Sequence, residues 1–92
     1  MRVVHWTDEA LDQALKIRDY LVVTSEEYAT QVIDNLFARI DQLVAFPLSG
    51  PLYAKAGLLQ VRELLVRPYK VVYEVTTRQI RILAVFHQRQ QG

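Results

Sequence analysis

The 92-residue sequence contains no cysteine. This absence excludes disulfide bonds, metal sites built on thiolates and a cysteine nucleophile, and it fits a protein of the reducing cytoplasm. Glycine and proline are also scarce, with three of each. Two of each fall between residues 47 and 57, so this stretch is predicted to be a loop.

Long hydrophobic runs are absent as well. No apolar stretch approaches the roughly 20 residues that a membrane-spanning helix needs. Two acids, Asp8 and Glu9, precede any apolar run, so we expect neither a signal peptide nor membrane association. The sequence shows no metal-ligand spacing and no phosphate-binding glycine loop, so no metal or cofactor is expected. Hydrophobic residues make up 51% of the chain, which predicts one domain over residues 1–92.

Charge is distributed unevenly along the chain. Residues 1–54 hold four Lys/Arg and eight Asp/Glu, whereas residues 55–92 hold seven Lys/Arg and two Glu, for net charges of −4 and +5. This asymmetry indicates that the second half meets something anionic, unless the two halves neutralise each other across the fold. The near-neutral total of +1 argues against a dedicated nucleic-acid-binding module.

Two amphipathic helices are predicted in the first half. Thr7 and Ser25 each precede two acids and have the pattern of helix N-caps. Helical spacing of apolar residues places the first helix at about residues 8–22. The second helix is expected to end near residue 46, because Pro47 disfavours a helical conformation before it. The short connection between them predicts an antiparallel helical hairpin over about residues 8–46.

Strands are predicted from β-branched and aromatic residues at about residues 1–6, 58–66, 69–76 and 79–86. The last three make a sheet over about residues 58–87, and the polar tail 88–92 is expected to be flexible. The order β-α-α-β-β-β is an α+β architecture, with the helical hairpin packed on one face of a small antiparallel sheet.

Alternation within the last two strands assigns side chains to the two sheet faces. Tyr69 and Tyr73 are expected to pack against the helices. If the alternation is regular, the opposite, open face carries the polar side chains Lys70, Glu74, Arg81 and His87. It also carries the apolar side chains Val72, Leu83 and Val85. A face that is half basic and half apolar favours docking of a partner.

Four short motifs follow one another in register along the chain. They are FPLSG at 46–50, VRELLV at 61–66, YKVVYEV at 69–75 and IRILAVFHQR at 80–89. Together they resemble the ParE/RelE superfamily of type II toxins over nearly the whole chain. The resemblance implies a small toxin that a cognate antitoxin neutralises. ParE-type members act on DNA gyrase without being nucleases, whereas RelE-type members cleave mRNA on the ribosome.

The choice between these two activities depends on particular residues. Metal-independent RNA cleavage needs cations around the phosphate and an acid for the leaving oxygen. The RelE-like alternative would use the cations Arg62, Lys70 and Arg81, with His87 as the acid. Departures from the RelE pattern favour the ParE-like branch. Glu63 lies where RelE-type strands tend to place a lysine, and no tyrosine follows Tyr73.

The preferred interpretation is therefore a toxin that binds gyrase and has no catalytic residues. Its partner-binding residues are predicted to be Arg62, Arg67, Lys70, Arg78, Arg81, His87 and Arg89. For Arg62 the alternative is a structural role in anchoring a loop, and for His87 it is capping of the last strand. The cognate antitoxin is expected to be an acidic or amphipathic segment that folds as it wraps the groove beside the helical hairpin and the sheet.

Overall fold

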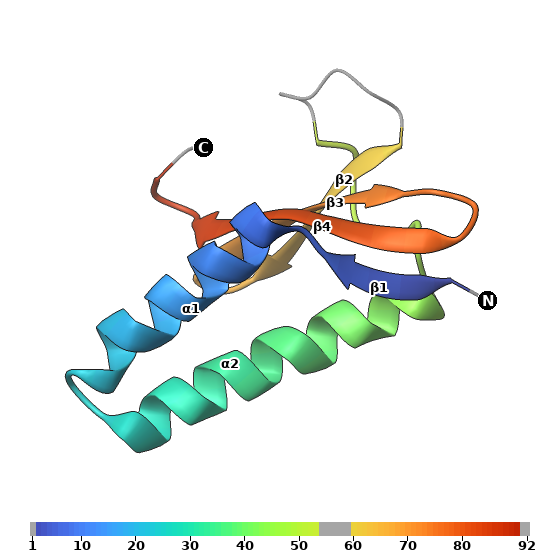
Figure 1. Cartoon of the computed structure of the whole chain (residues 1–92). Helices are drawn as coiled ribbons and strands as arrows, with labels where there is room; N and C mark the ends of the chain where they lie inside the picture. The colour runs from blue at the N-terminus through green and yellow to red at the C-terminus, as the bar shows by residue number, and fades with distance from the viewer. Residues whose placement is uncertain (1, 54–59, 91–92) are drawn as a thin grey trace.

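The computed structural model of the chain describes residues 2–53 and 60–90 (Figure 1). Its elements are, in order, β1 (Val3–Trp6), α1 (Asp8–Val22), α2 (Glu26–Asp41), the 3-10 helix η1 (Gln42–Val44), β2 (Val61–Val66), β3 (Tyr69–Val75) and β4 (Gln79–His87). The predicted β-α-α-β-β-β order and the α+β class are therefore confirmed. Residues 58 and 59, where a strand was predicted to begin, lie outside the described residues.

Both helices begin where side-chain capping predicts. The hydroxyl of Thr7 accepts the N–H of Ala10 at 3.2 Å, and that of Ser25 accepts the N–H of Tyr28 at 3.1 Å. These bonds satisfy N–H groups that have no partner within the helix. The second helix is shorter than predicted: α2 ends at Asp41, and the chain tightens into η1 before reaching Pro47.

The sheet has four strands in the order β1-β4-β3-β2. β3 runs antiparallel to both of its neighbours, but β1 pairs with β4 in parallel. The antiparallel sheet predicted for about residues 58–87 is therefore confirmed, and β1 adds a parallel edge strand that the prediction did not assign to the sheet. A parallel neighbour needs a long crossover, and the chain between β1 and β4 includes the helical hairpin. Figure 1 shows both helices on the same side of the sheet.

The core lies between the helices and the sheet. Tyr69 and Tyr73 are buried on the helix side, as predicted. Burial of each large apolar side chain stabilises the fold by about 1.5–3 kcal/mol. Among the described residues, the largest fully buried side chains of this layer are Leu36, Ile40, Leu43, Val71, Tyr73, Ile80, Ile82 and Val85.

A β-bulge interrupts the pairing of β3 with β4. Tyr73 lies opposite Ile82, but Val72 lies opposite Ala84, so Leu83 is an extra residue without a direct partner. The extra residue shifts the alternation of all later side chains of β4. Val85, predicted on the open face, is therefore in the core at 1% exposure, and that prediction is wrong.

Candidate functional site

The open face of the sheet carries two ion pairs. Lys70 and Arg81 lie there as predicted. Each stands between two strand residues whose side chains face the core, and neighbouring side chains of a strand point to opposite faces. The ammonium of Lys70 lies 3.4 Å from the carboxylate of Glu63, and the guanidinium of Arg81 lies 2.7 Å from that of Glu74. All four side chains are partly buried. Glu63 and Glu74, the two acids of residues 55–92, therefore each neutralise one of the cations that were predicted to contact a partner.

The exposed cations lie at two separate ends of the sheet. Arg67 in the β2–β3 turn and Arg89 after β4 share one end, because the N–H of Gln88 donates to the carbonyl of Pro68. Arg78 lies in the β3–β4 turn at the other end. Within residues 2–53 and 60–90, no ion pair involves Arg67, Arg78 or Arg89. The predicted basic set is thus divided and does not form one continuous patch.

Arg62 lies on the helix side of the sheet and holds a loop. It is opposite Tyr73 in the ladder. Its Nη1 donates to the carbonyl of Gly50 at 2.8 Å and lies 3.5 Å from that of Leu48. Its Nε is buried and has no hydrogen-bond partner in the described part of the chain. These contacts give Arg62 the loop-anchoring role that was the alternative to partner binding.

His87 also lies on the helix side, so its predicted place beside Lys70 on the open face is wrong. The bulge at Leu83 turns the side chain round, and His87 lies opposite Tyr69 with ring centroids 5.7 Å apart. Its Nδ1 accepts the backbone N–H of Arg89 at 3.1 Å. This bond stabilises the turn that follows β4.

The four side chains of the RNA-cleaving alternative do not converge. Lys70 and Arg81 are on the open face and are paired with carboxylates. Arg62 and His87 are on the helix side, on β2 and β4 respectively. A phosphate bound by Lys70 and Arg81 would be separated from Arg62 and His87 by the sheet. Transfer of a proton to a leaving oxygen requires hydrogen-bond reach, which this arrangement does not offer.

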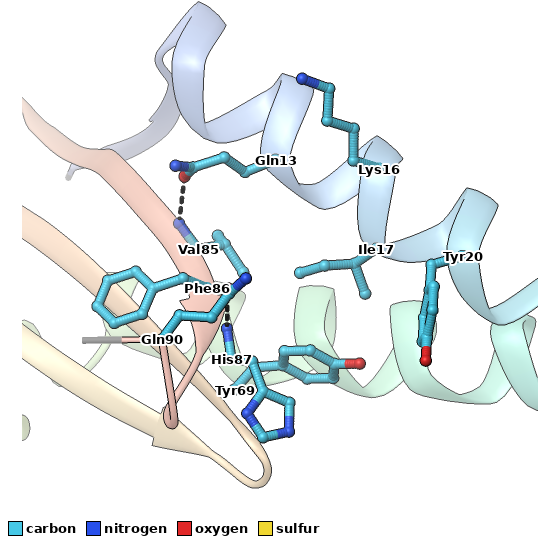
Figure 2. A pocket seen from close by; sticks show the side chains of 9 residues that line it. All are labelled: Gln13, Lys16, Ile17, Tyr20, Tyr69, Val85, Phe86, His87 and Gln90. Atoms are coloured by element: carbon cyan, nitrogen blue, oxygen red, sulfur yellow. Dashed lines mark hydrogen bonds between the residues drawn. The ribbon is translucent and has the colours of Figure 1, made fainter. Parts of the chain in front are cut away.

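A groove of about 520 Å³ lies between α1 and the end of β4 (Figure 2). Its apolar wall includes Ile17, and its aromatic side chains are Tyr20 and Tyr69. Phe86 also borders the groove, but it lies opposite Lys70 in the sheet and its ring points away from the two tyrosines in Figure 2. Lys16 places an ammonium group and His87 an imidazole ring at its border. Figure 2 shows Tyr20 and Tyr69 reaching into the same space from α1 and β3. The groove can therefore take an apolar side chain that has an acidic neighbour.

Glutamine side chains occupy the edge of β4 beside this groove. β1 ends at Trp6, opposite Ile82, and no other strand of residues 2–53 and 60–90 pairs with the later residues of β4 on that side. The side-chain carbonyl of Gln13 accepts the N–H of Val85 at 2.7 Å, and that of Gln90 accepts the N–H of His87 at 3.2 Å. These bonds give partners to two backbone N–H groups at the edge of β4 that would otherwise be exposed and unpaired.

The α1 residues of the groove were missed as functional candidates. Gln13, Ile17 and Tyr20 are spaced as one side of a helix, next to the stripe that packs on the core. An exposed tyrosine on that side, with Tyr20 78% exposed, is the signal that could have indicated a binding surface.

Comparison with protein families gives a match over residues 4–92 to the family described as the ParE toxin of the type II toxin–antitoxin system, parDE. The chain belongs to the ParE toxin family. A similar solved structure is the chromosomal ParDE TA system from P. aeruginosa, with a TM-score of 0.75 and 26% sequence identity over 95% of each chain. Curated protein sequences give no match. The expected ParE/RelE resemblance and the ParE-like branch are thus confirmed.

The described residues of this ParE toxin form neither a metal-binding cluster nor a membrane-spanning helix. No group of three or more His, Asp or Glu side chains lies together as a metal site would require within residues 2–53 and 60–90. No helix among the same residues is long and apolar enough to cross a membrane.

Two tyrosines of this ParE toxin have raised pKa values. Burial raises the pKa of Tyr69, and the neighbouring Tyr28 and Tyr20 raise it further. Burial also raises the pKa of Tyr73, although the hydrogen bond from Gly50 and the nearby guanidinium of Arg62 oppose that effect. Both hydroxyls therefore remain neutral donors at physiological pH.

These shifts predict a loss of stability at alkaline pH. Because the folded state holds the Tyr69 and Tyr73 protons more tightly than the unfolded chain, their contribution is complete below about pH 10 and falls as the pH rises further. Each tyrosine can change the slope of the free energy of unfolding against pH by at most about 1.4 kcal/mol per pH unit. Urea unfolding between pH 8 and 11 measures the slope. Tyr73→Phe should be less stable at pH 8 but should show a shallower decline, and an unchanged decline would contradict the assignment.

Proposed function

We propose that this ParE toxin inhibits DNA gyrase by binding it and is not a ribonuclease. The supporting observation is that the side chains needed for RNA cleavage are divided between opposite faces of the sheet. The two cations of the open face are already paired with carboxylates, and a carboxylate beside a scissile phosphate would repel it. What this geometry offers instead is a rigid surface for protein recognition.

Inhibition by binding requires a preference for one state of the target. A ligand shifts a conformational equilibrium only by the difference between its affinities for the two states. The toxin would therefore hold gyrase in one step of its cycle, such as the state with cleaved DNA. Gyrase acts on DNA in the cytoplasm, so the toxin would act there and arrest growth.

A pair of assays tests this function. The purified chain is added to gyrase, ATP and relaxed plasmid, and separately to a translating ribosome system with a labelled mRNA. We expect blocked supercoiling or trapped cleaved DNA in the first assay and intact mRNA in the second. Codon-phased mRNA cuts that disappear in Lys70→Ala would instead support the RelE-like alternative, and they would refute the proposed function.

An antitoxin is the second partner that we propose, and its docking site is the groove between α1 and β4. The similar P. aeruginosa structure is a ParDE system, so its toxin is described together with an antitoxin. The groove of this chain offers Ile17 and Tyr69 for apolar contacts. Lys16 lies 3.0 Å from the carboxylate of Asp12, but both side chains are exposed, so its ammonium can also contact an acid of the partner. A segment with apolar side chains and flanking acids fits the groove, and such segments often fold on binding.

Truncation of Tyr20 is expected to weaken antitoxin binding. Tyr20 is exposed and lines the groove, and tyrosines that become buried in an interface are frequent hot spots. Tyr20→Ala should raise the antitoxin Kd about 10- to 100-fold while leaving the melting temperature within about 2 °C. Titration calorimetry with the cognate antitoxin measures the change.

Val23→Ala is the matched control for that substitution. Val23 is also highly exposed on the helical hairpin, but it lies at the α1–α2 turn and does not line the groove. Its antitoxin Kd should stay within about twofold of the unmodified protein, as expected for a surface substitution outside the interface. Equal losses in the two variants would place the antitoxin elsewhere.

A further inference from the structure

The loop after η1 exposes three large apolar side chains. Phe46 is 66% exposed, Leu48 is 63% exposed and Leu52 is 46% exposed. Single exposed apolar residues are common on protein surfaces and need no explanation. Three within seven residues of one loop form a local cluster, which we call the apolar loop.

Buried polar groups hold the backbone of this loop in place. The hydroxyl of Tyr73 donates to the carbonyl of Pro47 at 3.0 Å and accepts the N–H of Gly50 at 3.1 Å. Arg62 donates to the carbonyl of Gly50 from the same side. The loop is thus ordered before it meets any partner, and a pre-ordered loop loses less entropy on binding.

The apolar loop lies at the opposite end of the molecule from the groove. Leu52 forms a bridge with Arg62, which is opposite Tyr73 in the ladder. The start of β2 also meets the end of β3, so this end is the one that carries the β3–β4 turn with Arg78. The groove lies at the other end, with His87 and the last turn. Figure 1 shows the two ends well separated along the sheet.

Charge at the end with the apolar loop limits the possible occupants. The Nε of Arg2 donates to the carbonyl of Thr76, so Arg2 lies beside the turn that carries Arg78. A symmetric dimer through this end of the sheet would place Arg2 and Arg78 of both copies in one interface, because an isologous interface uses the same patch twice. Like charges in such positions disfavour self-association. A different protein with carboxylates around an apolar cleft is complementary.

We propose that the apolar loop, with Arg78 at the same end of the sheet, is the surface that binds gyrase, a conclusion that rests on gyrase being the target. The exposed rings and methyl groups of Phe46 and Leu48 enter an apolar cleft of the enzyme, and Arg78 meets acidic groups at its border. The groove at the other end stays available for the antitoxin. The toxin then has two distinct interfaces, one for its target and one for neutralisation.

A double substitution with a matched control tests this assignment. Phe46→Ala/Leu48→Ala removes two exposed side chains of the loop, and Leu15→Ala/Val23→Ala removes two exposed ones from the helical hairpin. The toxin concentration for half-inhibition of supercoiling should rise at least about 10-fold in the loop variant and stay within about twofold in the control. Arg78→Glu should weaken inhibition by several-fold, and more so at low salt.

Antitoxin affinity and direct gyrase binding distinguish the outcomes. The loop variant should keep its antitoxin Kd within about twofold and its melting temperature within about 2 °C. If the unmodified protein inhibits gyrase and the loop variant inhibits equally well, the loop assignment is refuted while the proposed function stands. If the unmodified protein neither binds nor inhibits gyrase, both fail. If the loop variant loses its antitoxin instead, the loop belongs to the antitoxin interface and the proposal is wrong.

Discussion

Gly50→Ala is expected to destabilise the protein by about 2–4 kcal/mol, although it adds a single methyl group. A Cβ atom at Gly50 would collide with the backbone carbonyl oxygen of Glu63 and would lie 2.7 Å from the Tyr73 hydroxyl. The first obstacle is part of β2 and cannot turn away as a flexible side chain could. The requirement for glycine is thus one of space.

The collision also affects the contacts that order the loop. The N–H of Gly50 donates to the buried hydroxyl of Tyr73, and its carbonyl accepts from Arg62. If the loop moves outward to make room for the methyl group, these polar groups lose partners while they remain buried. A buried group left without its hydrogen bond costs about 1–3 kcal/mol. Relaxation therefore replaces steric strain with a desolvation cost of similar size.

Urea denaturation of Gly50→Ala measures the loss, with Leu48→Ala as the control. Leu48 belongs to the same loop, but its side chain is exposed, so its truncation should change the stability by less than about 0.5 kcal/mol. A folded domain is stable by only about 5–15 kcal/mol, so the glycine substitution should move the midpoint clearly. A Gly50→Ala protein as stable as the control would show that the loop is not held as described.

The elements that follow from local signals were predicted well. Thr7 and Ser25 cap helices because their hydroxyls reach N–H groups three residues away, which the sequence alone determines. Tyr69 and Tyr73 were correctly placed against the helices by the alternation of β3. These features depend on residues close in sequence, so no knowledge of the tertiary arrangement was needed.

The features that were not predicted correctly depend on contacts between residues distant in sequence. Nothing within the first six residues indicates that β1 pairs in parallel with β4, more than 70 positions later. The ion pairs of Lys70 with Glu63 and of Arg81 with Glu74 require the register of three strands. Because charge was counted along the chain, the basic half was predicted to present its cations to an anionic partner. Its acids in fact lie beside its cations.

The bulge in β4 could not be predicted because the sequence around it is uniformly apolar. From Ile82 to Phe86 the chain reads Ile-Leu-Ala-Val-Phe, so hydrophobic alternation does not indicate which side chains face the core. A one-residue shift exchanges the two faces of a strand. The misplacement of His87 followed directly from this ambiguity, and the alternative catalytic set was assembled on the same assumption.

Val85→Lys and Ala84→Lys, two substitutions at adjacent positions, test the bulge, and they should have opposite outcomes. Val85 is 1% exposed, lies opposite Val71 and belongs to the core cluster. An ammonium group there would have to be buried without a partner, so Val85→Lys should cost more than about 4 kcal/mol and unfold most of the protein. Ala84 lies on the open face and is partly exposed, so Ala84→Lys should cost about 1 kcal/mol or less.

Circular dichroism and urea titration of the two lysine variants decide between the bulged strand and a regular one. In a regular strand with Ile80 and Ile82 in the core, Ala84 would also face the core and Val85 would face solvent, so the order of the two effects would be reversed. The bulge predicts that the Val85→Lys protein is largely unfolded while the Ala84→Lys protein keeps its groove and its antitoxin affinity, because Val85 but not Ala84 lines the groove. A stable Val85→Lys protein would return His87 to the open face beside Lys70, and the argument against RNA cleavage would lose its basis.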